Sequence, residues 1–176
     1  DLERFQSLHE HDVELNLAES GVHPLTAADL VDEEEMRELM RLPLGYAQTN
    51  GPLELRQRIG AHLKVEPRHV LVTSATIEAN FICAWALLEP GDEVSYMVPN
   101  YLQIQGLAES FGASVRPFSL RPELGWQPDP DELERSVNPA TRMIALVNPN
   151  NPTGSVLEPA AMERIVELAR SVGAWL

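Results

Sequence analysis

Short apolar segments alternate with longer amphipathic segments from about residue 46 to the end of the chain. The short segments are rich in strand-forming residues, and the longer ones carry apolar residues at helical spacing, as at Ile77, Phe81 and Trp85. We therefore expect alternating strands and helices. The expected strands are residues 70–73, 93–98, 114–120 and 143–147, with another beginning at 174–176; the expected helices are residues 52–63, 77–88, 102–111, 131–137 and 159–172.

This alternation predicts an α/β fold with a mostly parallel sheet and helices on both faces. Turn-forming residues separate the elements, among them Pro90-Gly91-Asp92 and the helix-ending Gly112 and Gly173. Residues 122–130 are expected to form a loop. In such a fold, ligands bind at the carboxyl ends of the parallel strands, so functional side chains are expected there.

The first 45 residues differ from the rest of the chain, because they are acidic and have only one strand-like apolar run, at residues 13–17. Two short helices are expected, at residues 26–31 and 33–41. Asp32 is a candidate N-cap for the second helix, with Glu35 three residues further on. We therefore expect two parts, residues 1–45 and residues 46–176.

Composition narrows the classes of function. The 176 residues carry a net charge of −14, which disfavours binding to nucleic acid and to anionic membranes. No apolar run is long enough to span a bilayer, and the first residues, Asp1-Leu2-Glu3, lack the basic region and apolar core expected of a secretory signal. The chain lacks an initiator Met, so we expect it to be trimmed or processed. The single cysteine fits a reducing compartment, and we expect a cytoplasmic protein.

Polar residues follow the first expected strand, in residues 72–79 (Val-Thr-Ser-Ala-Thr-Ile-Glu-Ala). This strand leads directly into a helix, whose free N–H groups and dipole favour an anion such as phosphate. The ordinary alternative is that Ser74 or Thr76 caps the helix without any ligand. Taken alone, the segment favours that alternative.

Three other segments carry candidate chemistry. Residues 148–154 (Asn-Pro-Asn-Asn-Pro-Thr-Gly) follow a strand directly, and their side-chain amides can point into a crevice. Residues 98–101 end in Tyr101, which can stack on a planar ligand or lie in the core. Residues 46–51 begin with Tyr46 and precede the pair Leu55-Arg56. His9 and His11 lie close together in the acidic arm but without cysteine partners, so no metal site is expected.

Together, in this order and spacing, these segments resemble the amino-terminal part of fold-type I, pyridoxal-phosphate-dependent enzymes of the class I/II aminotransferases. The Asn-Pro-Asn-Asn-Pro-Thr-Gly run is the most specific element, and the resemblance extends from about residue 15 to residue 176. It implies an N-terminal arm or small-domain segment at residues 1–45, then the first part of a large cofactor-binding domain at residues 46–176. The domain would be incomplete without downstream residues.

The resemblance also implies site residues for pyridoxal 5'-phosphate. Ala75, Thr76 and Ile77 match the positions that hold the cofactor phosphate. Tyr101 matches the aromatic residue that stacks on the pyridine ring, and Asn151 matches the asparagine that hydrogen-bonds the phenolic oxygen.

Three further residues follow from the same resemblance. Tyr46 matches a tyrosine that reaches across a homodimer interface to the neighbouring subunit's phosphate. Ala18 and Glu19 resemble a segment that folds over the substrate.

The chain departs from the family pattern in several places. Family members commonly have glycine where Ala75 stands and often a hydroxyl where Ile77 stands. The Schiff-base lysine, the carboxylate that keeps the pyridine nitrogen protonated and the substrate-binding arginine all belong to later segments than this chain contains. Lys64, the only lysine, lies near the end of an expected helix and is interpreted as a surface residue.

The resemblance predicts transamination between an amino acid and a keto acid. One alternative is elimination, cyclisation or oxidation on the same cofactor, as in 1-aminocyclopropane-1-carboxylate synthases or enzymes resembling capreomycidine synthase. Another is a non-catalytic α/β module that binds a phosphorylated ligand or only dimerises.

Overall fold

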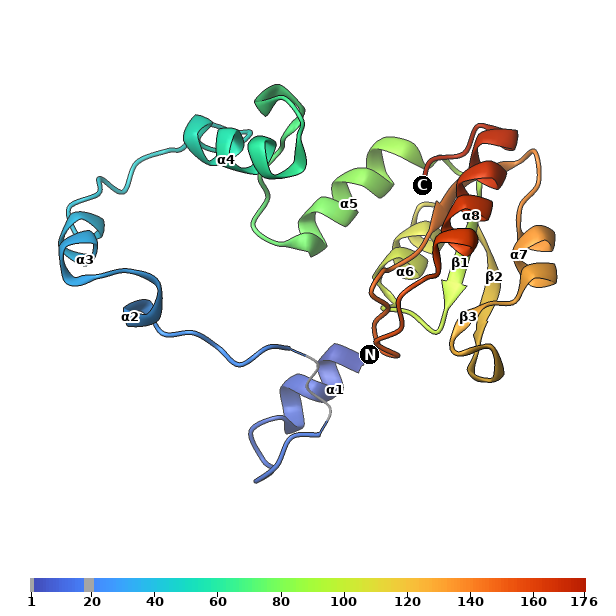
Figure 1. Cartoon of the computed structure of the whole chain (residues 1–176), viewed down its shortest axis with the longest axis horizontal. Helices are drawn as coiled ribbons and strands as arrows, with labels where there is room; N and C mark the ends of the chain where they lie inside the picture. Colours follow the sequence, from blue (N-terminus) through green and yellow to red (C-terminus); the bar gives the residue numbers. More distant parts are fainter. Residues whose placement is uncertain (1, 18–20) are drawn as a thin grey trace. The chain divides into compact units, whose positions relative to one another are not determined.

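The computed structural model describes residues 2–17 and 21–176 and divides into two compact units, Asp1–Tyr46 and Ala47–Leu176 (Figure 1). The first unit contains the short helices α1 (Leu2–His9), α2 (Ala27–Leu30) and α3 (Glu33–Leu39). The second unit contains the sheet and all the other helices. Each unit is described separately.

The two short helices expected in the first unit are confirmed. The Asp32 carboxylate accepts hydrogen bonds from the N–H groups of Glu34 and Glu35, and the Glu35 carboxylate accepts one from the Asp32 N–H. This reciprocal capping box explains why α3 begins where it does. The apolar run at residues 13–17 forms bends instead of a strand, because no extended segment pairs with it in the described part of the chain.

The sheet of the second unit has the strand order β3-β2-β1-β4. Strand β1 pairs in parallel with β2 on one side and with β4 on the other, and the short β3 is antiparallel to β2. Trp175 forms a parallel bridge with Met143 of β4, where the sequence predicts the start of another strand. The prediction of a mostly parallel sheet is confirmed. The strands are β1 (Glu93–Val98), β2 (Ser114–Arg121), β3 (Gln127–Pro128) and β4 (Thr141–Ala145).

Helices cover both faces of this sheet, as predicted (Figure 1). Successive strand residues point to opposite faces, so β1 contributes to both cores. Val94 packs with Ala84 and Ala108 of α5 and α6, whereas Met97 packs with side chains of α7 and α8. The helices of this unit are α4 (Leu53–Leu63), α5 (Thr76–Leu87), α6 (Gln103–Ser110), α7 (Pro130–Ser136) and α8 (Pro159–Val172), with 3-10 turns at Pro67–His69 and Pro122–Leu124.

The strand predicted at residues 70–73 is wrong. Val70 has an extended backbone, with φ −110° and ψ 122°, but the segment joins no sheet. Among the described residues, its one backbone hydrogen bond to a distant segment runs from the Val72 N–H to the Asn50 carbonyl, over 3.1 Å. A strand exists only as part of a ladder, and a strand-like sequence does not form one without a neighbour. The prediction of a loop at residues 122–130 is incomplete, because this segment also contains a 3-10 turn and the short strand β3.

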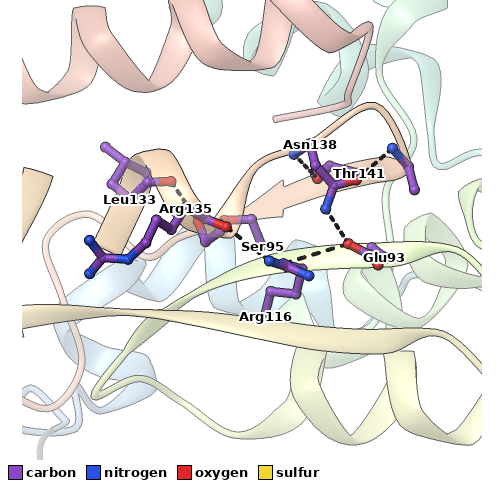
Figure 2. Close-up of polar contacts among 9 residues, drawn as sticks. Glu93, Ser95, Arg116, Leu133, Arg135, Asn138 and Thr141 are labelled. Carbon is purple, nitrogen blue, oxygen red and sulfur yellow. Dashed lines mark hydrogen bonds and ion pairs between the residues drawn. The ribbon is translucent and has the colours of Figure 1, made fainter. Parts of the chain in front are cut away.

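At the amino ends of the strands, polar side chains form hydrogen bonds and an ion pair between neighbouring elements (Figure 2). The Glu93 carboxylate accepts a hydrogen bond from the Asn138 side-chain amide and lies 3.6 Å from the Arg116 Nε. Arg116 also donates to the Arg135 carbonyl, over 3.0 Å, and the Thr141 hydroxyl accepts from the Asn138 N–H. These contacts join β1, β2, β4 and α7 at the end of the sheet opposite the candidate ligand loops.

A second cluster, around Arg121, joins the end of β2 to the start of α7. The guanidinium pairs with the carboxylates of Asp129 and Glu132. Glu132 also accepts a hydrogen bond from the Ser119 N–H, and Asp129 accepts one from the Glu132 N–H as the N-cap of α7. These hydrogen bonds, and then the Arg121 charge, hold the pKa values of both carboxyl groups below their ordinary range.

Acidification should therefore weaken this cluster. A carboxyl group whose pKa is lowered by folding stabilises the folded state above its unfolded pKa and loses that contribution as the pH falls through the folded pKa. We expect the urea midpoint of the complete protein to fall between about pH 5 and pH 3, and the double variant Asp129→Asn, Glu132→Gln to show a shallower fall. Glu163→Gln, an exposed carboxylate of α8, is the control. Equal slopes in the double variant and the wild type would contradict the prediction.

Candidate functional site

The loop after β4 is fixed by Asn150, which is only 4% exposed. Its side-chain amide donates to the Pro99 carbonyl over 3.0 Å. Its side-chain oxygen accepts from the N–H and the hydroxyl of Thr153, over 3.2 and 2.7 Å. Because Pro99 directly follows β1, Asn150 joins the loops at the carboxyl ends of two adjacent strands.

The three asparagines of residues 148–154 have different surroundings. The Asn148 side-chain oxygen accepts from the Leu157 N–H over 3.0 Å, so both Asn148 and Asn150 serve the loop itself. Asn151 is exposed, and its side-chain amide makes no hydrogen bond within the described part of the chain. Of the three, Asn151 is therefore the one whose side chain makes none of the hydrogen bonds that the structure describes in this loop, and its amide is available to a ligand.

The backbone of Tyr101 is held at both its polar groups. Its N–H donates to the Asn100 side-chain oxygen over 2.7 Å, and its carbonyl accepts from the Tyr96 hydroxyl over 2.6 Å. Burial raises the pKa of Tyr96 to about 12, so this hydroxyl stays a neutral donor at physiological pH. Tyr96 is the tyrosine that lies in the core, whereas Tyr101 is half-buried and begins the connection to α6.

The first turn of α5 is not capped by a side chain. Its N-cap is Ala75, and the neighbouring polar groups bond elsewhere: the Thr73 hydroxyl donates to the Ala75 carbonyl, and the Ser74 N–H donates to the Glu78 carboxylate. The alternative that Ser or Thr caps this helix is therefore wrong. The exposed N–H groups of the first turn keep their capacity to bind an anion.

Gln103 was not predicted from the sequence. It lies at the start of α6, directly after the loop at residues 99–102 (the Tyr101 loop), and joins this loop to the first turn of α5. Its side-chain amide donates to the Ile77 carbonyl over 2.7 Å, and its side-chain oxygen accepts from Asn80 over 2.9 Å. Nothing in the local sequence marks Gln103, since its partners lie more than 20 residues away in α5. The segment that contains Pro99, Tyr101 and Gln103 is therefore bonded on both sides. Gln103 joins it to the first turn of α5, and Asn150 joins it to the loop that carries Asn151.

An apolar groove between α5 and α6 lies beside this region. It is lined by Ile77, Phe81, Gln103 and Leu107, among others. Neither Tyr101 nor Asn151 lines it, so the groove is not the candidate ligand site.

The remaining predicted residues are not brought into this arrangement. Tyr46 ends the first compact unit and is fully exposed, and the structure does not test its role at a partner subunit. Ala18 and Glu19 lie outside the described residues. The candidate site described by the structure therefore consists of residues 75–77, Tyr101 and Asn151.

Three features together are typical of proteins that bind a phosphorylated cofactor. They are a mostly parallel sheet between helices, a helix N-terminus without a side-chain cap, and hydrogen-bonded loops that carry an aromatic residue and a free amide. Comparison with known proteins identifies the family within this class. The chain belongs to the class I and II aminotransferase family, whose sequence model matches residues 15–176.

Individual relatives agree with this membership. The chain is 34% identical over 166 residues to capreomycidine synthase of Streptomyces vinaceus, and 30% identical over 168 residues to aspartate/prephenate aminotransferase of Thermus thermophilus. Each alignment covers 92% of this chain but only 43% and 44% of the respective relative. A solved PLP-dependent aminotransferase from Streptococcus suis matches 98% of this chain and 48% of its own, with 30% identity and a TM-score of 0.91. The chain thus spans less than half the length of these relatives.

Replacing Asn150 or Asn151 should separate a structural amide from a free one. Asn150→Ala removes three hydrogen bonds and leaves the Pro99 carbonyl without its partner, so we expect a loss of about 1–3 kcal/mol in the free energy of unfolding. Asn151→Ala removes none that the structure describes and should change it by less than about 0.5 kcal/mol. Urea unfolding of the complete protein measures both variants, and equal losses would refute the assignment.

Proposed function

We propose that the protein to which this chain belongs is a pyridoxal-phosphate-dependent enzyme that transfers an amino group between an amino acid and a keto acid. The observation that carries the proposal is the hydrogen bonding between two loops and the first turn of a helix. Asn150 and Gln103 hold the Asn151 loop, the Tyr101 loop and the first turn of α5 together at one edge of the sheet. Family membership supports the choice of cofactor.

The residues present fit this cofactor. Its phosphate needs hydrogen-bond donors, which the N–H groups of Ala75, Thr76 and Ile77 and the Thr76 hydroxyl would supply. Ala75 has an extended backbone, with φ −165°, so this position does not require glycine on conformational grounds. Ile77 adds no hydroxyl, so we expect one phosphate contact fewer than in relatives that have one there.

The other two residues would hold the ring. Tyr101 would stack on it, and the free amide of Asn151 would donate to its phenolic oxygen. When bound, the cofactor supplies an electron sink for the negative charge that develops at the α-carbon of an amino acid. In this proposal the chain orients the cofactor, and the groups that move protons lie elsewhere in the protein.

Lys64 does not serve as the lysine of such an enzyme. It is exposed, adopts a left-handed backbone with φ 57°, and ends α4 as its C-cap. The proposal therefore places the reactive lysine, the carboxylate near the pyridine nitrogen and the substrate-binding arginine in segments beyond this chain.

The proposal includes a homodimer in which Tyr46 reaches the phosphate bound by the neighbouring subunit. It also includes Ala18 and Glu19 as residues that lie near the substrate. Both follow from the family resemblance. A cytoplasmic location is proposed because the chain has a single cysteine. Among the described residues, no helix is both long and apolar enough to cross a membrane.

A second candidate function uses the same cofactor for elimination, cyclisation or oxidation. The observation that favours it is the 34% identity to capreomycidine synthase. The site residues described above serve either chemistry, because they bind the cofactor and not the substrate side chain.

Reaction products distinguish these functions. If the complete, cofactor-loaded protein is incubated with single amino acids, transamination should give keto acid and an equal amount of pyridoxamine phosphate. Alkene, a cyclic product or ammonia would instead support the second candidate. A protein with no visible absorbance from lysine-bound cofactor, and no cofactor trapped by borohydride, would be the non-catalytic module.

Asn151 provides a residue-level test. We expect Asn151→Ala to raise the dissociation constant for pyridoxal phosphate roughly tenfold, as the loss of about 1.4 kcal/mol of hydrogen bonding requires. The control is Gln105→Ala, since the Gln105 side-chain amide donates to the Glu109 carboxylate within α6 over 3.0 Å. Equilibrium titration of the apo form measures both, and unchanged affinity in Asn151→Ala would remove this residue from the proposed site.

A further inference from the structure

Tyr96 is a buried residue of β1 whose hydroxyl reaches the loop that follows the strand. The residue is 1% exposed and is the largest fully buried side chain among the described residues. Its hydroxyl donates to the Tyr101 carbonyl over 2.6 Å. Phenylalanine would fill nearly the same volume, so the hydroxyl is what tyrosine adds at this position. Because a buried hydroxyl is unfavourable without a hydrogen bond, the contact with Tyr101 is what makes tyrosine acceptable here.

The neighbours of Tyr96 in β1 point to the other face of the sheet. Ser95 is fully buried, and its hydroxyl lies 2.6 Å from the Ser136 hydroxyl of α7. Met97 packs with side chains of α7 and α8. Because strand residues alternate, Tyr96 shares its face with Val94, which packs with α5 and α6. Two adjacent buried hydroxyls of β1 thus serve different elements: Ser95 bonds to α7, and Tyr96 bonds to the loop before α6.

The contact with Tyr96 restricts the direction of the Tyr101 side chain. The Tyr101 N–H donates to the Asn100 side-chain oxygen over 2.7 Å, and its carbonyl accepts from Tyr96. The peptide groups on both sides of the Tyr101 α-carbon are therefore held. A residue has only two soft backbone dihedrals, and fixing both peptide groups restricts φ and ψ together. The bond from the α-carbon to the ring then leaves the backbone in one direction.

Of the contacts that hold this loop, only the one from Tyr96 comes from the central strand. Asn100 is adjacent to Tyr101 and moves with the loop. Asn150 holds the Pro99 carbonyl, but it belongs to another loop. Tyr96 is instead part of β1, where it is paired with Pro117 of β2 and Ala145 of β4. Its hydroxyl therefore ties the orientation of Tyr101 to the sheet itself.

We propose that Tyr96 is a positioning residue that orients Tyr101 for stacking on the pyridine ring of the cofactor. It acts through the Tyr101 carbonyl and does not itself contact the cofactor. This inference rests on the proposed function, since it requires Tyr101 to stack on a bound ring.

The first test measures cofactor affinity in Tyr96→Phe, a variant of the complete protein that loses only the hydroxyl. We expect the dissociation constant for pyridoxal phosphate to rise about fivefold, because stacking is weakened and not abolished. Inorganic phosphate, measured as a competitor of cofactor binding to the apo form, should keep its dissociation constant within about twofold, because it has no ring to stack. A variant that disturbs the whole site would weaken the binding of both.

Ser95→Ala is the matched control. It removes the neighbouring buried hydroxyl of the same strand, whose partner lies in α7. It should lower the urea midpoint of the protein, as Tyr96→Phe does, but leave the affinity for pyridoxal phosphate within about twofold.

A double-mutant cycle tests whether Tyr96 acts through Tyr101. Tyr101→Ala should raise the dissociation constant for pyridoxal phosphate about tenfold, because the stacked ring is lost. In that background, Tyr96→Phe should have less than about a twofold further effect, since no ring remains to be oriented.

Amide hydrogen exchange of the apo protein gives a readout that needs no cofactor. Tyr96→Phe should speed exchange at the Tyr101 amide, because the loop loses its bond to β1, but not at the amides of β1 itself. Unchanged exchange in β1 also shows that the variant is folded. Ser95→Ala should leave the Tyr101 rate unchanged.

The outcomes separate this inference from the proposed function. If the wild type binds pyridoxal phosphate but Tyr96→Phe binds it equally well, Tyr96 is not a positioning residue and the proposed function stands. Effects of Tyr96→Phe and Tyr101→Ala that multiply, or an equal loss of phosphate affinity, would overturn the inference in the same way. If the wild type fails to bind pyridoxal phosphate, the proposed function fails and this inference fails with it.

Discussion

Strand β1 is hydrogen-bonded along both edges, to β2 and to β4, and its two faces carry the two cores. In this position its direction determines where every other element of the second unit lies. Because the three strands run parallel, their carboxyl ends open at the same edge, and the loops that follow β1 and β4 become neighbours. The candidate site depends on this neighbourhood, since Tyr101 and Asn151 are 50 residues apart in sequence.

Within that frame, side chains that donate to backbone carbonyls of distant segments do much of the local positioning. Asn150 binds the Pro99 carbonyl and Gln103 binds the Ile77 carbonyl of α5, whereas Arg56 binds two carbonyls. A carbonyl oxygen that is removed from water needs a donor, and a side chain that supplies one from a distant segment restricts two segments at once. The residues proposed to contact the cofactor are by contrast exposed or half-buried.

Several elements could be predicted because their causes are local. The β1 segment has the bounds expected from its apolar run, and α3 begins at the capping box of Asp32 and Glu35. The same local reasoning failed at residues 70–73, where a strand-like run has no neighbouring strand to pair with in the described chain. It also favoured a capped start for α5, because Ser and Thr are common caps, whereas their groups bond elsewhere.

The sequence by itself determined the α/β class, because periodicity and turn residues act over short distances, and its ordered motifs identified a cofactor-binding family. Only the tertiary structure decided that Asn151 takes no part in the hydrogen bonds that fix its own loop, that Gln103 joins the start of α6 to the first turn of α5, and that Arg56 is buried with no carboxylate partner among the described residues. These properties depend on which distant carbonyl lies opposite a given donor. That pairing is created by the packing of strands and helices far apart in the chain, so no local pattern contains it.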